Sequence, residues 1–393
     1  MTKIKETQMP LKFKIIMAVI FLAAMNFFLY GSYLVMLAFA MCVLYRNKNF
    51  VVPKGSVYLI LFSMSYNFFM ILTSSEINLR VIAAPCAYMA AYNLYDDAAE
   101  YDSEKVLTVI TYAMALHSLL SFIYLYRTQG INSFSQGAGY DIWSGSSSTS
   151  TGIAANYYFL AATVPMLLMK GKWHHYIIYI LALIHDILLG GRTFLVLSGI
   201  SVLLTFVLKI FLEKKRVSVV IKYVIAFGII ACVLIIIYQK NIFNIRNTFE
   251  SSYMWRRFFS ANPYEKLNET SRWERKYIYL QNLFTYPFGG GHMRNDLGVG
   301  YAHDIWLDTF DTAGVITMII LLFYSITSIF RFLRYSKICQ TVKEKIVFYV
   351  LPIVLTVAFF VEPIMDGCPM VFFMYCFMDG FVSKKLERGY VAE

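Results

Sequence analysis

The chain has 393 residues, of which 59% are hydrophobic and only 15% are charged. An ordinary soluble domain carries roughly 25% charged residues, because its surface faces water. The composition excludes a soluble multidomain protein and predicts helices that face lipid. The net charge of +11 lies largely in loops between apolar runs, which indicates orientation in a membrane and no nucleic-acid partner.

The apolar runs predict an all-α polytopic integral membrane protein with about twelve spans of roughly 20 residues. A single membrane domain is expected over residues 1–393. The run 15–45 is too long for one straight helix across a ~30 Å core. It predicts two short helices that turn near Gly31, with one long tilted helix as the alternative. The expected spans are 14–29, 31–45, 55–74, 80–96, 105–126, 152–169, 174–190, 193–212, 217–239, 312–332, 345–362 and 367–382.

The loops between these spans predict the orientation of the chain. Lysine and arginine form clusters that all fall on one side of a twelve-span protein, and that side is cytoplasmic by the positive-inside rule. Both termini are then cytoplasmic, and some of this charge is expected to contact anionic membrane lipids. The clusters lie at the N-terminus, 46–54, 170–172, 214–216, 331–345 and 384–388.

Two polar loops are expected to face outward. The first, 127–151, is rich in serine and predicts a flexible connection. The second is a long extracytoplasmic loop, 240–311, with nine basic and five acidic residues between 240 and 302, a net +4. An anion site is one interpretation, because the planar fork of arginine suits phosphate oxygens. The alternative is that so long a loop escapes the orientation rule.

The second loop contains the pattern of an amphipathic helix at the membrane surface. Ser271 and Glu274 have capping-box spacing, which predicts that the helix starts there. Pro287 and the glycines 289–291 are expected to end the segment. The apolar positions recur at helical spacing and are expected to pack against other helices: Trp273, Tyr277, Leu280 and Phe284. Basic residues lie off this stripe: Arg272, Arg275 and Lys276.

The six cysteines form no C-x-x-C pair, and most lie inside apolar runs. This pattern indicates buried free thiols and gives no sign of a metal or redox site. No cofactor and no metal are expected.

After the glycines, His303-Asp304 precedes nine residues and then Gly314-Val-Ile-Thr317. This arrangement resembles the signature of the O-antigen ligase and polymerase superfamily of bacterial polytopic membrane glycosyltransferases. There a His, usually followed by Asn, Ser or Gln, closes a long external loop and precedes a Gly-x-x-Gly/Thr element. Asp304 departs from that pattern, because the family usually carries Asn at this position.

Three further segments are similar to the same family and occur in the same order. They cover the back two-thirds of the chain together with the His motif. The segments are Thr151-Gly-Ile-Ala-Ala-Asn156 before a span with Pro165, the turn Gly190-Gly191-Arg192-Thr193, and Ser271-Arg272 leading to Pro287-Phe-Gly-Gly-Gly.

The resemblance implies a metal-independent glycosyltransferase of the GT-C type on the outer face of the bacterial plasma membrane. Its substrate would be an oligosaccharide linked to undecaprenyl diphosphate, and its partners a flippase and chain-length regulator proteins. The leading function is a polymerase that joins repeat units into O-antigen, capsule or exopolysaccharide. A ligase is the nearest alternative. A transporter or flippase is the alternative from another class, but it should show two related halves.

The leaving diphosphate needs fixed positive charge, which predicts roles for arginines. The predicted catalytic residues are Arg192 and Arg272 for the diphosphate and His303 for the acceptor hydroxyl. The predicted substrate-binding residues are Arg294, Arg275, Asp304, Asp186 and Asn156.

Four of these assignments have competing interpretations. Arg192 can instead be a snorkelling residue at a membrane boundary, and His303 a capping or packing residue at the start of a span. Asp186, deep in an apolar span, is expected to position Arg192, with a structural helix contact as the alternative. Asp304 shares a helix face with Asp308 and Asp311, which either binds the loop arginines or sugar hydroxyls or is a solvated face.

Overall fold

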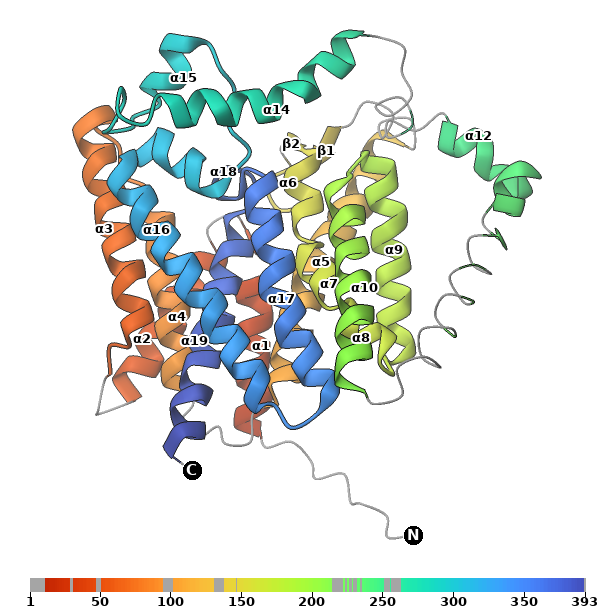
Figure 1. Cartoon of the computed structure of the whole chain (residues 1–393), viewed down its shortest axis with the longest axis horizontal. Helices are drawn as coiled ribbons and strands as arrows, with labels where there is room; N and C mark the ends of the chain where they lie inside the picture. Colours follow the sequence, from red (N-terminus) through yellow and green to blue (C-terminus); the bar gives the residue numbers. More distant parts are fainter. Residues whose placement is uncertain are drawn as a thin grey trace.

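The computed structural model describes residues 11–28, 31–46, 51–94, 102–130, 138–145, 147–213, 235–250 and 263–391, with a few single positions between them. Figure 1 shows a bundle of helices with α14, Pro263–Gln281, and α15, His292–Leu297, lying across one end. The C-terminal helix and the loop between α16, Ile305–Ile338, and α17, Val342–Val361, reach the other end. We refer to the two as the α14 end and the opposite end.

Two helices form the N-terminal apolar run, as predicted: α1, Leu11–Ala24, and α2, Gly31–Arg46. The expectation of one turn between them is therefore confirmed, and the single tilted helix is wrong. The next helices follow the predicted spans closely: α3, Lys54–Ser74; the 3-10 turn η1, Leu79–Ile82; α4, Ala83–Asn93; and α5, Ser103–Gln129. Asp102 caps α5 by accepting a hydrogen bond from the Glu104 N–H at 2.9 Å.

The expected flexible connection between 127 and 151 contains a hairpin in its described part. Strands β1, Ala138–Tyr140, and β2, Ser147–Thr149, pair antiparallel, with Ala138 opposite Thr149. The Asp141 carboxylate accepts hydrogen bonds from the backbone N–H groups of Trp143 and Ser144, both at 2.9 Å. This local satisfaction of backbone donors by an Asp side chain is what lets a serine-rich segment form a turn.

The predicted span 152–169 is broken into three short helices: α6, Ser150–Ala155; α7, Tyr158–Ala162; and α8, Val164–Leu168. Pro165 lies in the first turn of α8, where its missing N–H costs no hydrogen bond. Two unbroken helices follow: α9, Trp173–Leu189, and α10, Thr193–Leu212. Most of the predicted span 217–239 lies outside the described residues.

The long loop contains a short 3-10 turn, η4, Ile242–Asn244, then the helices α12, Ile245–Glu250, α14, Pro263–Gln281, and α15, His292–Leu297. The start of α14 differs from the prediction, because the helix is already formed eight residues before the Ser271 capping box. The stripe also differs. Trp273, Tyr277 and Leu280 are exposed, while Lys276 and Tyr279 on the other face are buried. An amphipathic helix at a membrane surface is expected to expose its apolar face in this way.

The last helices are α16, Ile305–Ile338; α17, Val342–Val361; α18, Ile364–Gly367; and α19, Pro369–Val391. Residues 369–383 of α19 are buried throughout, so this helix lies inside the bundle. Near the opposite end, Arg331 of α16 donates to Asp379 of α19 at 2.8 Å and joins the two helices. Within the described residues, five helices are long and apolar enough to cross a membrane: α3, α5, α10, α16 and α17. The chain is an α-helical, membrane-embedded protein.

A kink divides α16, and the glycine segment, residues 289–291, forms backbone hydrogen bonds with it. Ala313 and Gly314 leave the helical conformation, which frees the carbonyl groups of the preceding turn. The N–H groups of Gly290 and Gly291 donate to the carbonyls of Thr312 and Asp311, at 2.9 and 2.8 Å. The glycines therefore bring one backbone close to another, which side chains would prevent.

Candidate functional site

A cavity of about 390 Å³ opens at the α14 end of the bundle, between α6, α7, α10, α14 and α17. It brings together Arg192 and Arg272, which are far apart in the sequence and are both predicted to bind a diphosphate. A carboxylate, Glu362, is the acidic member of the lining. The residues around the cavity are Thr151, Ala154, Tyr158, Gly190, Gly191, Arg192, Thr193, Val196, Leu197, Arg272, Val357, Val361 and Glu362.

Arg192 is placed by the tight turn between α9 and α10. It is the N-terminal flanking residue of α10, whose first turn has backbone N–H groups without helical partners, and this end of a helix favours anions. The turn requires a glycine at 191, because a Cβ there would lie 2.1 Å from an oxygen of Asp186. Arg192 therefore adds its guanidinium to an end of a helix that is already favourable for phosphate.

Arg272 reaches the cavity from α14 and binds the end of α17. Its Nη1 donates to the Val361 carbonyl at 3.2 Å and lies 3.8 Å from an oxygen of Glu362. The last carbonyl groups of a helix carry partial negative charge, so a cation is stabilised there. The contact fixes the middle of α14 over the cavity.

Glu362 is a site residue that the sequence reasoning missed. It is only 3% exposed, and the hydroxyl of Thr193 donates to it. It follows the last residue of α17 because Pro363 disfavours a helical conformation for the residue before it. An acidic residue before proline at the end of an apolar run is a signal that could have identified it.

Lys276, one turn after Arg272 on α14, joins three elements. Its Nζ lies 3.4 Å from Asp304 and donates to the carbonyl of Phe360. Burial lowers the pKa of Lys276, and the Asp304 carboxylate opposes that shift. Burial likewise raises the pKa of Asp304, opposed by hydrogen bonds from backbone N–H groups and by Lys276. The pair holds α14 on the start of α16.

His303 lies at the start of α16 in a left-handed backbone conformation, with φ 55°. Asp308 holds this loop by accepting from the backbone N–H groups of Ala302, at 2.8 Å, and Asp304, at 3.0 Å. Asp304 caps α16 through the N–H groups of Trp306 and Leu307. His303 is half-buried and is not among the residues that line the cavity. Its neighbour Asp304 pairs with Lys276 of α14, and the same helix carries Arg272.

The other predicted arginines lie outside the cavity. Arg294 forms an ion pair with Asp311 at 2.7 Å and lies over the Tyr301 ring, 4.2 Å from its centre. Arg275 packs beside Gly300, where an added Cβ would lie 2.9 Å from its Nη1. Arg294 therefore has much of its charge neutralised within the protein.

Two predicted substrate-binding residues, Asp304 and Asn156, have contacts within the protein. Asp304 is a helix cap that pairs with Lys276. Asn156 donates to the His117 ring at 3.2 Å, inside the bundle and away from the cavity. The three aspartates of α16 are buried, so the interpretation of a solvated face is wrong: Asp304, Asp308 and Asp311. Asp311 pairs with the loop arginine Arg294, as one interpretation expected, whereas Asp304 pairs with Lys276 and Asp308 accepts from backbone N–H groups.

Asp186, which was expected to position Arg192, forms no hydrogen bond with it. Both its oxygens are buried and have no hydrogen-bond partner within the described residues. The neighbouring His185 contacts Tyr157, whose hydroxyl lies 2.6 Å from Nδ1 of that ring. Asp186 instead packs against the turn backbone at Gly191, so any influence on Arg192 passes through the shape of this turn.

No group of three or more His, Cys, Asp or Glu side chains in the described ranges is arranged to hold a metal ion. What the cavity offers is two guanidinium groups, one carboxylate, two threonine hydroxyls and one tyrosine. Such a set can bind an anion with at least two charges and place a hydroxyl compound beside it. The sequence matches no protein-family model and no curated protein.

Proposed function

We propose that the protein is a polymerase that joins undecaprenyl-diphosphate-linked oligosaccharide units into a surface polysaccharide. The observation that carries the proposal is the meeting of Arg192 and Arg272 in one cavity at the α14 end. These two arginines come from separate segments whose sequences resemble the O-antigen ligase and polymerase superfamily. Twelve spans, a GT-C architecture and an outward-facing α14 end belong to the same proposal.

The reaction needs little more than charge stabilisation and a base. The acceptor hydroxyl attacks the anomeric carbon of the donor sugar, and the bond from that carbon to the diphosphate oxygen breaks. Arg192 and Arg272 bind the departing diphosphate, where fixed cations contribute most because water is largely excluded. The hydroxyl proton passes to the imidazole of His303, because a histidine side chain is the group most often used as a general base.

Reconstitution tests this function directly. Purified protein in lipid vesicles with a lipid-linked repeat unit should produce a ladder of longer lipid-linked glycans. A single conjugate with a different acceptor would instead support the ligase, and movement of intact substrate across the membrane without new glycosidic bonds would support a transporter. Unchanged substrate on the accessible face would contradict all three.

His303→Gln should lower the rate of polymer formation by about 10²- to 10⁴-fold, the usual contribution of a general base. Accumulation of single lipid-linked units, measured by gel electrophoresis of extracted glycolipids, checks this result. His292→Gln is the matched control, because His292 is exposed on the nearby α15. Polymer of normal length and amount from His303→Gln would contradict the assigned role.

Glu362→Gln is expected to strengthen the binding of undecaprenyl diphosphate by about tenfold. Glutamine keeps an acceptor atom for Thr193 but removes a negative charge 3.8 Å from Arg272. Binding can be measured by isothermal titration in detergent, with Glu274→Gln on the exposed side of α14 as the control. Weaker binding would mean that Glu362 acts mainly by orienting Arg272.

A further inference from the structure

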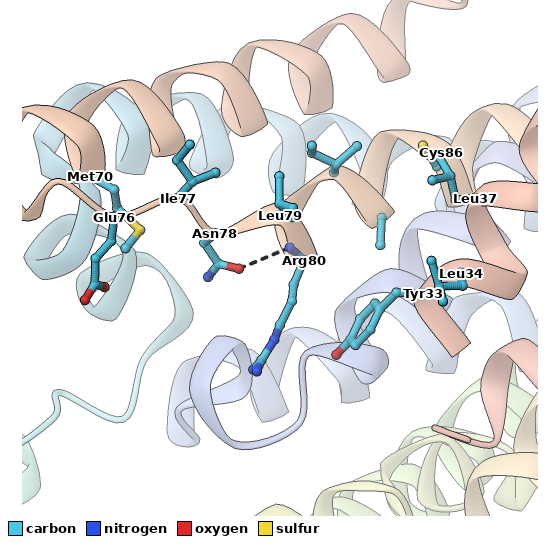
Figure 2. A pocket seen from close by; sticks show the side chains of 12 residues that line it. Tyr33, Leu34, Leu37, Met70, Glu76, Ile77, Asn78, Leu79, Arg80 and Cys86 are labelled. Carbon is cyan, nitrogen blue, oxygen red and sulfur yellow. Dashed lines mark hydrogen bonds between the residues drawn. The ribbon is translucent and has the colours of Figure 1, made fainter. Parts of the chain in front are cut away.

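A second and larger hollow lies between α2, α3 and α4. It has a volume of about 720 Å³ and a mainly apolar lining (Figure 2). Figure 2 shows the Arg80 side chain pointing away from Ile77 and Leu79, on the side of the Tyr33 ring. Glu76 lies beside Met70, on the side of Arg80 away from Tyr33. The lining consists of Tyr33, Leu34, Leu37, Met70, Glu76, Ile77, Asn78, Leu79, Arg80, Ile82, Ala83 and Cys86. We call it the Arg80 groove.

The Arg80 groove lies at the same end of the bundle as the arginine cavity. Its lining comes from the first turns of α2, the last turn of α3 and the segment that leads into α4. The end of α3 touches the glycine segment of the long loop, because Phe69 stacks on Phe288 with ring centres 6.0 Å apart. Both hollows therefore lie at the α14 end of the bundle.

A short segment after α17 connects the two hollows. Glu362 lines the arginine cavity. Four residues later, Asp366 in α18 lies within electrostatic range of both Arg80 and Arg294. The segment 362–366 therefore runs from the cavity of Arg192 and Arg272 toward the side of the Arg80 groove that carries Arg80.

The chemistry of the Arg80 groove matches a lipid carrying a phosphate group. Exposed apolar side chains such as Leu34, Leu79 and Ile77 gain stability by contact with a hydrocarbon chain. Arg80 in the lining supplies a planar cation for phosphate oxygens. A free sugar or a soluble anion would leave most of this apolar surface without a matching partner.

We infer that the Arg80 groove binds the prenyl chain and diphosphate of the acceptor, while Arg192 and Arg272 bind the donor diphosphate. The inference rests on the proposed function, because only the joining of two lipid-linked units requires two prenyl diphosphate sites in one leaflet. The growing chain then leaves the donor site, and the undecaprenyl diphosphate that carried it stays there.

Binding stoichiometry tests the inference without requiring activity. The full chain is purified in detergent, and undecaprenyl diphosphate is added and counted by native mass spectrometry. We expect two molecules for each chain. Arg80→Gln should weaken one of them by about 10- to 100-fold and Arg192→Gln the other by a similar factor, the usual effect of losing a hydrogen bond from a charged group.

Two further variants separate charge from shape. Leu37→Trp narrows the groove without changing its charge and should weaken the same molecule as Arg80→Gln. Arg127→Gln is the matched control, because Arg127 is exposed near the end of α5 and lines neither hollow. It should retain both molecules.

Each other outcome overturns a specific statement. One bound molecule that Arg192→Gln weakens and Arg80→Gln leaves unchanged would overturn the inference but not the proposed function. Displacement of the second molecule by an equal amount of phosphatidylglycerol would make the groove a site for ordinary membrane lipid and also overturn it. No bound molecule at all would overturn the proposed function itself.

Discussion

Arg192→Gln is expected to lower the rate of polymer formation by roughly 10²- to 10³-fold, the usual cost of removing one preorganised group that stabilises developing charge. Arg192 lies at the positive end of α10 and lines the cavity together with Arg272. Glutamine keeps much of the side chain's length but cannot neutralise a diphosphate. The rate of ladder formation by the reconstituted protein measures the effect.

A lysine at the same position distinguishes charge from geometry. Arg192→Lys keeps the positive charge and loses the planar fork, so it should restore only part of the rate. Arg127→Gln, at an exposed position near the end of α5, should behave like the unchanged protein. If Arg192→Gln were present in the membrane at normal level and made polymer at the normal rate, Arg192 would be a boundary residue only.

Gly314→Ala is expected to destabilise the α14 end strongly, although it adds only one methyl group. Gly314 has φ 82° and ψ 169°, a region that is essentially restricted to glycine and costs about 1–3 kcal/mol for other residues. An added Cβ would also lie 2.6 Å from the Pro287 carbonyl oxygen. That oxygen accepts a hydrogen bond from Val315 at 3.0 Å, so the methyl group would break the contact between the kink and the glycine segment.

Gly298→Ala provides the matched control for this prediction. Gly298 also has a positive φ, 62°, but nothing lies within 4 Å of an added Cβ. Its cost should be limited to the backbone conformation, about 1–2 kcal/mol. Protease cleavage between residues 282 and 300 should be faster in Gly314→Ala than in Gly298→Ala. Equal cleavage rates would mean that the glycine segment does not depend on the kink.

The sequence predicted the features that arise from local composition and periodicity. The apolar runs predicted α3, α5, α10 and α17 to within a few residues, because lipid-spanning helices need long uninterrupted apolar segments. The break near Gly31 followed from the length of the apolar run 15–45 alone, because one straight helix of that length is too long for the membrane core. The exposed stripe of α14 and the broken span 152–169 differed from the predictions, because burial of a helix face depends on its neighbours and on the membrane surface.

The candidate site shows the same division. The sequence by itself determined the candidate residues. Arg192, Arg272 and His303 stand in segments whose order and spacing are distinctive. Only the tertiary structure decided which of them meet. Arg192 and Arg272 share a cavity, whereas Arg294 is paired with Asp311 and Asn156 with His117. Buried polar groups take the nearest partner that satisfies them, and that partner lies far away in the sequence.

Glu362 and Arg80 complete the contrast between sequence and structure. Neither belongs to a motif, and each has its place only because α17 ends just before Glu362-Pro363 and α3 ends beside α4. The amino-acid sequence determined a membrane-embedded helical protein with excess positive charge in its longest loop. The packing of the helices then selected two hollows at one end and placed guanidinium groups in both, because a side chain's surroundings depend on contacts that no local pattern encodes.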